Sequence, residues 1–68
     1  MDSKKIIKAI KKKGWVHIRT TGGHWHFHHP EQAGIVTVPH PKKDIPIGTL
    51  KSIEKQANME FKQEVRNV

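Results

Sequence analysis

A glycine pair between two alternating segments constrains this chain more than any other feature. Side chains alternate in the manner of a strand over residues 15–20, and imidazoles alternate with aromatic rings over residues 24–29. Gly22 and Gly23 stand between the two segments, and adjacent glycines can adopt the positive φ angles that tight hairpin turns require. The sequence therefore predicts an antiparallel β-hairpin that turns at Gly22-Gly23.

The alternation gives each side chain of the hairpin a predicted face. Three imidazoles share one face: His24, His26 and His28. Trp25 and Phe27 occupy the other face, which we expect to be buried, although Trp25 could instead stack on a nucleic-acid base. In the first segment we expect Val16 and Ile18 on the buried side and Arg19 on the outward side.

An amphipathic helix is predicted ahead of the hairpin. Ile6, Ile7 and Ile10 form an apolar stripe among lysines, as in a surface helix that packs on a core. We expect Ser3 to cap the N-terminus of this helix and Gly14 to end it.

A third strand and a second helix complete the predicted fold. The β-branched run at residues 35–38 is typical of a strand, and prolines then lead to a helix that starts near Pro46. The order α-β-β-β-α predicts an α+β domain in which a three-stranded antiparallel sheet buries one face under two helices, as in double-stranded-RNA-binding domains. We expect this domain to span residues 1–57, with a tail of unassigned role at 58–68. The predicted core contains Ile6, Ile10, Val16, Ile18, Phe27, Val36, Leu50 and Ile53.

Size and charge narrow the function classes. The chain has 68 residues, no cysteine and no apolar run of the roughly 18 residues that a membrane span needs, so we expect a cytoplasmic protein without disulfides. Thirteen Lys and Arg residues against six Asp and Glu residues leave a net charge of +7. Such a balance favours RNA or an acidic protein as the partner, although a well-solvated basic surface is the simpler alternative.

His24 is the candidate catalytic residue, because imidazole exchanges protons near neutral pH. RNA carries its own nucleophile, the 2′-hydroxyl, so one acid–base group near the backbone can promote strand scission. Gly22 and Gly23 would let a phosphate approach the main chain closely, although a hairpin turn alone also explains them. Four further side chains could contact the RNA backbone or simply be solvated: Arg19, His26, Lys42 and Lys43.

Two other readings compete with metal-free cleavage. A His-x-His-x-His strand could bind zinc, but alternate residues lie about 6.6–6.8 Å apart, so three ligands converge only if the strand bends. Apart from Glu31, no carboxylate lies near this segment, and we therefore predict no metal and no cofactor. The second alternative is a module that binds structured RNA without cutting it. His40, between two prolines, could frame the site or pack.

Several short motifs, in a fixed order over residues 3–57, resemble the HicA family of toxin ribonucleases. They are Gly22-Gly23-His24, Phe27, His29-Pro30, residues 36–41, Asp44-Ile45-Pro46 and Gly48-Thr49-Leu50. The resemblance implies a double-stranded-RNA-binding-like fold and mRNA cleavage without a metal. It also implies a HicB antitoxin that covers the active site.

The same resemblance assigns individual roles. It makes His24 the catalytic histidine and Gly22 the glycine required ahead of it. The family commonly has Gly-Ser-His at this place, whereas this chain has Gly22-Gly23-His24, so that Gly23 replaces the serine. Taken together, these observations predict an endoribonuclease toxin, with Phe61 of the tail as a possible apolar anchor for the antitoxin.

Overall fold

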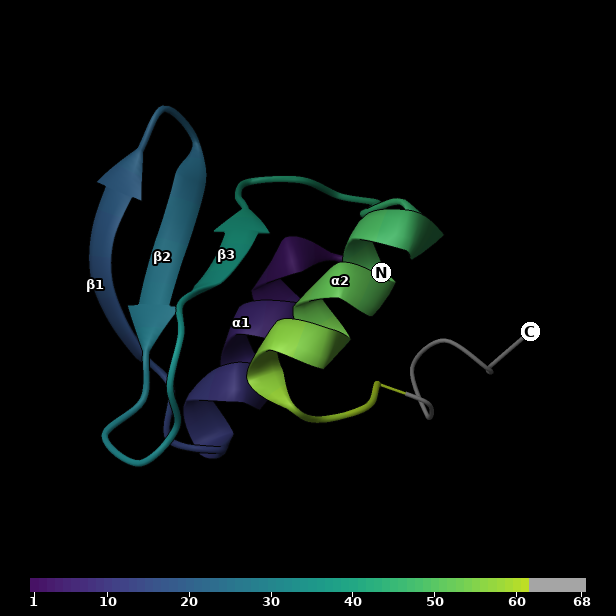
Figure 1. Cartoon of the computed structure of the whole chain (residues 1–68). Coiled ribbons are helices and arrows are strands. Elements are labelled where there is room, and N and C mark those ends of the chain that lie inside the picture. The colour runs from purple at the N-terminus through teal and green to yellow at the C-terminus, as the bar shows by residue number, and fades with distance from the viewer. Residues whose placement is uncertain (62–68) are drawn as a thin grey trace.

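The computed structural model describes residues 1–61, which form one layer of sheet and one layer of helices (Figure 1). The order of elements is the predicted α-β-β-β-α. The elements are α1 (Ser3–Lys12), β1 (Val16–Thr21), β2 (His24–His28), β3 (Val36–Pro39) and α2 (Ile47–Ala57). The sheet has the strand order β1-β2-β3, and both strand pairs are antiparallel. The predicted fold class is therefore confirmed.

Asp2, and not Ser3, caps the N-terminus of α1. The backbone of Asp2 is extended, and its carboxylate accepts a hydrogen bond from the Lys4 amide at 2.9 Å. A carboxylate also suits the positive end of the helix dipole. Ser3 is instead the first helical residue and is fully buried, so its hydroxyl is used for a tertiary contact that is described below.

The prediction that Val16 and Ile18 lie in the core is wrong. Their side chains are 49% and 43% exposed. A bulge between His17 and Arg19 shifts the β1–β2 register, so that His17 pairs with Phe27 on the buried side and Val16 pairs with His28 on the outer side. Trp15, just ahead of the strand, is 1% exposed and fills the space that the sequence pattern had assigned to the aliphatic pair.

Helix α2 covers the free edge of β3. The Thr37 amide, on that edge strand, donates a hydrogen bond to Gln56 Oε1 at 3.1 Å. The contact satisfies a backbone donor that would otherwise be unpaired, and it fixes α2 beside the sheet. Leu50, Ile53 and Ala57 are the buried residues of the helix, which ends at Asn58 in a left-handed conformation with φ of 54°.

The core extends into the C-terminal segment. Phe61 is 3% exposed, and its amide donates to Glu54 Oε2 at 2.7 Å. Because its ring packs inside the chain's own core, the prediction that Phe61 anchors a partner is wrong; residues 62–68 lie outside the described part. The buried apolar residues are Ile6, Ile7, Ile10, Trp15, Phe27, Val36, Val38, Ile45, Leu50, Ile53, Ala57 and Phe61.

Candidate active site

The outer face of the sheet carries most of the polar side chains that were singled out in the sequence. Directly paired residues of an antiparallel sheet project to the same side. The register pairs Thr21 with His24, Arg19 with His26, His26 with Thr37, and His24 with Pro39. The expectation that the imidazoles of β2 face away from the core is therefore confirmed, since Phe27 on the opposite face is fully buried.

A groove of about 440 Å³ lies where this face meets α2. His24 lines it from the start of β2, and Lys42 lines it from the loop after β3. The other lining residues are Thr37, Pro39, Pro46, Thr49, Ser52, Ile53 and Gln56. Hydroxyl, amide and ammonium groups thus surround one imidazole.

His24 owes its position to the hairpin turn. Gly22 and Gly23 have φ angles of +48° and +83°, as in a two-residue turn that needs positive φ at both central residues. The turn is also tied to the loop after β3, because the His40 amide donates to the Gly23 carbonyl at 2.9 Å. The positive φ angles of the turn therefore account for both glycines. Crowding does not, at least at Gly22, because a Cβ atom there would have no other atom within 4 Å.

The histidines other than His24 and His28 are held by neighbouring groups. His17 bonds Thr20 Oγ1 at 2.9 Å and stacks on Trp25 with 4.3 Å between ring centroids. His26 bonds Thr37 Oγ1 at 3.0 Å. His29 contacts the Lys13 carbonyl and accepts from the Glu31 amide, both at 2.9 Å, and His40 bonds Ser3 Oγ at 2.7 Å.

Within residues 1–61, only the rings of His24 and His28 are both exposed and without such a contact. Of these two, His24 alone lines the groove. An imidazole with both ring nitrogens available can accept a proton at one and donate at the other. Among the described residues, His24 is therefore the exposed imidazole that lines the groove and makes no such contact.

Lys42 is positioned by a small network around Ser3. The Ser3 amide donates to the Lys42 carbonyl at 2.9 Å, and the Lys42 amide donates to Ser3 Oγ at 3.0 Å. The same hydroxyl bonds the His40 ring, whose own amide holds the Gly23 carbonyl. One buried serine thus links the loop that carries Lys42 to the turn that precedes His24.

Trp25 lies between two imidazoles and is only half-buried. Beyond its stack with His17, it meets the edge of His40 with 4.7 Å between centroids. The sequence left open whether Trp25 packs against the core or stacks on a nucleic-acid base. The structure favours packing, because the ring already has partners on the core side of the sheet.

The other predicted contact residues lie outside the groove. Arg19 shares the outer face with His26 but does not line the cavity, and Lys43 is exposed on the loop without lining it. Conversely, sequence reasoning missed the contribution of α2. Thr49, Ser52 and Gln56 recur at helical spacing beside the apolar stripe, and this polar stripe was the signal that could have indicated a functional face.

Nothing in the described part of the chain forms a ready metal centre. Over residues 1–61, no three or more His, Cys, Asp or Glu side chains come together in a way that could hold a metal ion.

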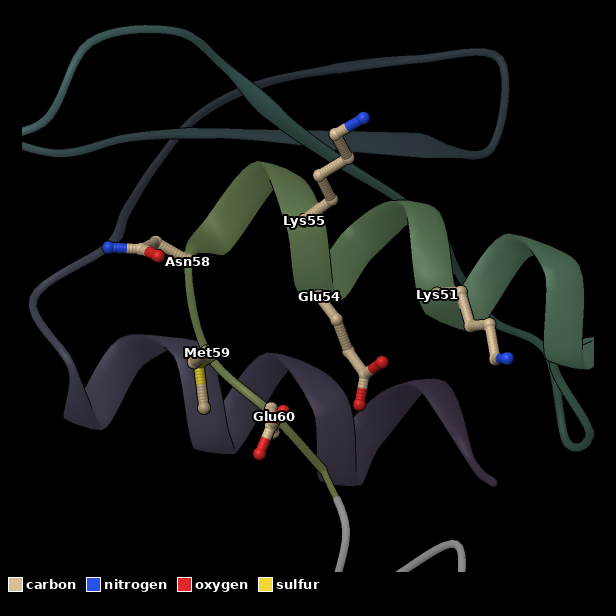
Figure 2. A pocket seen from close by; sticks show the side chains of 6 residues that line it. All are labelled: Lys51, Glu54, Lys55, Asn58, Met59 and Glu60. Carbon is tan, nitrogen blue, oxygen red and sulfur yellow. The ribbon is translucent and has the colours of Figure 1, made fainter.

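A larger hollow, of about 520 Å³, lies at the C-terminal end of α2 (Figure 2). It contains no histidine, and its carboxylates offset its ammonium groups. The lining residues are Lys51, Glu54, Lys55, Asn58, Met59 and Glu60. The groove at His24 is therefore the better candidate for a site that handles a phosphate.

The fold and the groove define a small basic α+β protein with one available imidazole beside a lysine. Residues 3–59 match the family model described as the HicA toxin of bacterial toxin–antitoxin systems. The chain belongs to this HicA toxin family.

A solved structure supports this assignment. The toxin–antitoxin complex of HicA3 and HicB3 contains a chain that is 32% identical over 90% of this chain and 98% of that chain, with a TM-score of 0.73. No curated protein matched the sequence. Within the described residues, no helix has the length and apolar character needed to cross a membrane.

Proposed function

We propose that this toxin is a metal-independent endoribonuclease that cleaves mRNA, with His24 as the acid–base residue. The observation that carries the proposal is that His24 is the available imidazole that shares a groove with Lys42. Family membership supports the same reading, since HicA toxins are in general mRNA-cleaving. Cytoplasmic action on transcripts follows from the proposed substrate.

The chemistry needs one proton acceptor and a way to stabilise negative charge. His24 takes the proton of a ribose 2′-hydroxyl as its oxygen attacks the adjacent phosphorus. The bond from phosphorus to the 5′-oxygen breaks, and that oxygen gains a proton, in the simplest case from water. The products are a 2′,3′-cyclic phosphate and a 5′-hydroxyl. A placed acid–base group contributes about 10²–10⁴-fold to such a step.

Lys42 supplies the positive charge in this groove. Its ammonium can stabilise the charge that develops on the phosphoryl oxygens during attack. Thr37, Thr49 and Ser52 offer hydroxyl groups that can bind ribose or phosphate oxygens. The proposed contacts of Gly22, Gly23, Arg19, His26 and Lys43 are peripheral to this centre, because none of these residues lines the groove.

We further propose that a HicB-type antitoxin inhibits the chain by covering the groove. The HicA3 and HicB3 complex supports this partner class. The outer face adds apolar contact area through Val16, which is 49% exposed. Antitoxin and RNA should then compete, and binding of the antitoxin should weaken with salt to the extent that it uses Lys42.

The test compares purified wild-type protein with His24→Ala and His28→Ala on a defined mRNA. His28 is a matched control, because it is an exposed histidine on the same face of β2 that does not line the groove. We expect His24→Ala to lose at least 100-fold in cleavage rate, as estimated from the acid–base contribution, and His28→Ala to cut normally. Equal loss in both variants, or none in either, contradicts the assignment.

The competing function is an RNA-binding module without chemistry. The basic charge and the fold support it equally well. It predicts that wild-type protein binds RNA and releases it intact. A substrate with one 2′-deoxyribose at the cleavage site separates the two, because only the proposed reaction needs that hydroxyl.

A further inference from the structure

The outward side of α1 carries a row of lysines that the proposed cleavage reaction does not use. The lysine row is Lys4, Lys8, Lys11 and Lys12. All four side chains are exposed, whereas Ile6, Ile7 and Ile10 on the other side of the helix are buried. Over residues 1–61, none of the four takes part in an ion pair, and α1 contains no acidic residue.

The lysine row starts where the groove ends. The main chains of Lys42 and Ser3 are joined by the hydrogen bond from the Ser3 amide to the Lys42 carbonyl, and Lys4 follows Ser3 directly. With a helical rise of 1.5 Å per residue, Lys4, Lys8 and Lys12 are spaced about 6 Å apart along the axis, over about 12 Å in total. Positive charge therefore continues from the groove along the helix.

The arrangement is unfavourable for the isolated helix. Lys4 and Lys8, and Lys8 and Lys12, are like charges four residues apart, and such pairs destabilise a helix. No carboxylate on the helix offsets them. A bound polyanion would remove the repulsion, so the row suits a helix that works against phosphates.

The composition of the row favours RNA over an acidic protein. Protein–protein interfaces have an apolar centre and are depleted of lysine, whereas interfaces with nucleic acids are strongly positive and polar. The apolar side chains of α1 that could form such a centre are already buried in the chain's own core. Lysines also bind phosphates as flexible point charges, without regard to base sequence.

We propose that the lysine row binds the backbone of the RNA strand beyond the point of cleavage, so that the substrate runs from His24 past Lys42 and along α1. This inference rests on the proposed function, because it assigns a path on the protein surface to the RNA that is cleaved at His24. It predicts that affinity depends on RNA length, whereas the chemical step does not depend on the row.

The experiment measures binding of labelled single-stranded RNA of about 12 nucleotides by fluorescence anisotropy, as a function of salt. All proteins carry His24→Ala, so that no cleavage disturbs the titration. The test variant is Lys8→Gln with Lys12→Gln, and the matched control is Lys51→Gln with Lys55→Gln. The control pair is also exposed and four residues apart on a helix, but it lines a hollow that is also lined by Glu54 and Glu60, so that its charge is offset there (Figure 2).

We expect the test variant to flatten the slope of log K against log salt by about 1.4 units, which is about 25-fold weaker binding at 0.1 M salt. The control pair should change the slope by less than half as much. A four-nucleotide RNA should bind both variants equally. In the background with His24 intact, the test variant should raise KM for the long RNA and leave kcat unchanged.

Equal effects of the two pairs would overturn the proposal, because they would show a general effect of net charge. So would unchanged RNA affinity together with weaker binding of an acidic antitoxin, since the row would then serve a protein. A thermal unfolding midpoint at or above that of the parent verifies that the test variant is folded. The titration measures binding without cleavage. A result against the lysine row therefore does not affect the catalytic role proposed for His24, and a result against His24 in the cleavage test does not affect the lysine row.

Discussion

Removing the hydroxyl of Ser3 tests how much the hydrogen bonds between Ser3, His40 and Lys42 contribute to the free energy of unfolding. Ser3 is fully buried, and its Oγ contacts His40 Nδ1 at 2.7 Å and the Lys42 amide at 3.0 Å. Ser3→Ala leaves both partners without this contact. An unsatisfied buried polar group costs about 1–3 kcal/mol, and because both partners here are partly exposed, each loss is placed near about 1 kcal/mol, which makes about 2 kcal/mol for the two together.

The magnitude follows from these terms. Alanine is the better helix former by about 0.5 kcal/mol, which offsets part of the loss at this first helical position. The net destabilisation expected is about 1.5 kcal/mol, out of a total of roughly 3–10 kcal/mol for a chain of 68 residues. In a domain of this size the loss corresponds to a midpoint about 6–12 °C lower.

Urea denaturation followed by tryptophan fluorescence measures the free energy of unfolding. Ser52→Ala on α2 is the control for stability, because this serine is exposed and its loss should stay within about 0.5 kcal/mol. Combining Ser3→Ala with His40→Ala should give a coupling energy of at least about 0.5 kcal/mol. Additive effects of the two substitutions would refute the idea that the hydroxyl and the ring act through each other.

Three further predictions concern the core, the turn and metals. Phe61→Ala should destabilise the fold by about 3–5 kcal/mol in the same assay, whereas Ile47→Ala, at a 57% exposed position, should cost less than about 1 kcal/mol; similar losses would contradict the packing of Phe61. Gly22→Asn should keep the hairpin, since Asn tolerates positive φ, but slow RNA cleavage if a phosphate passes close to the turn; full activity would reduce Gly22 to a turn residue. Excess chelator should leave cleavage unchanged, and loss of activity that zinc restores would favour a hydrolase that uses zinc.

The elements of this fold could be predicted from the sequence because each has a local signal. The isoleucine stripe of α1, the glycine turn and the β-branched run of β3 act within a few residues. The face assignment of β1 failed, because the bulge after His17 depends on pairing with β2 and on the bulk of Trp15, neither of which the alternation of β1 records. The prediction for Phe61 failed for a similar reason, since the burial of its ring requires α2 and the segment that follows α2 to be in place.

The site was predictable only in part. His24 could be identified because its turn is encoded by adjacent glycines. Its neighbours in the groove come from β3, the following loop and α2, and Lys42 is distinguished from Lys43 only by the contacts of its main chain with Ser3. Residues that are distant in sequence and have no unusual chemistry, such as Ser3, gain their importance from the tertiary structure alone.

The most direct test of the central claim is the rate at which purified protein cuts a defined transcript in excess chelator, with and without the His24 ring. The account predicts measurable scission by the wild type, products ending in a 2′,3′-cyclic phosphate, and a loss of at least about 100-fold in His24→Ala. A His24→Ala protein that is folded and cuts at the wild-type rate would contradict the claim, as would a folded wild type that leaves the transcript whole.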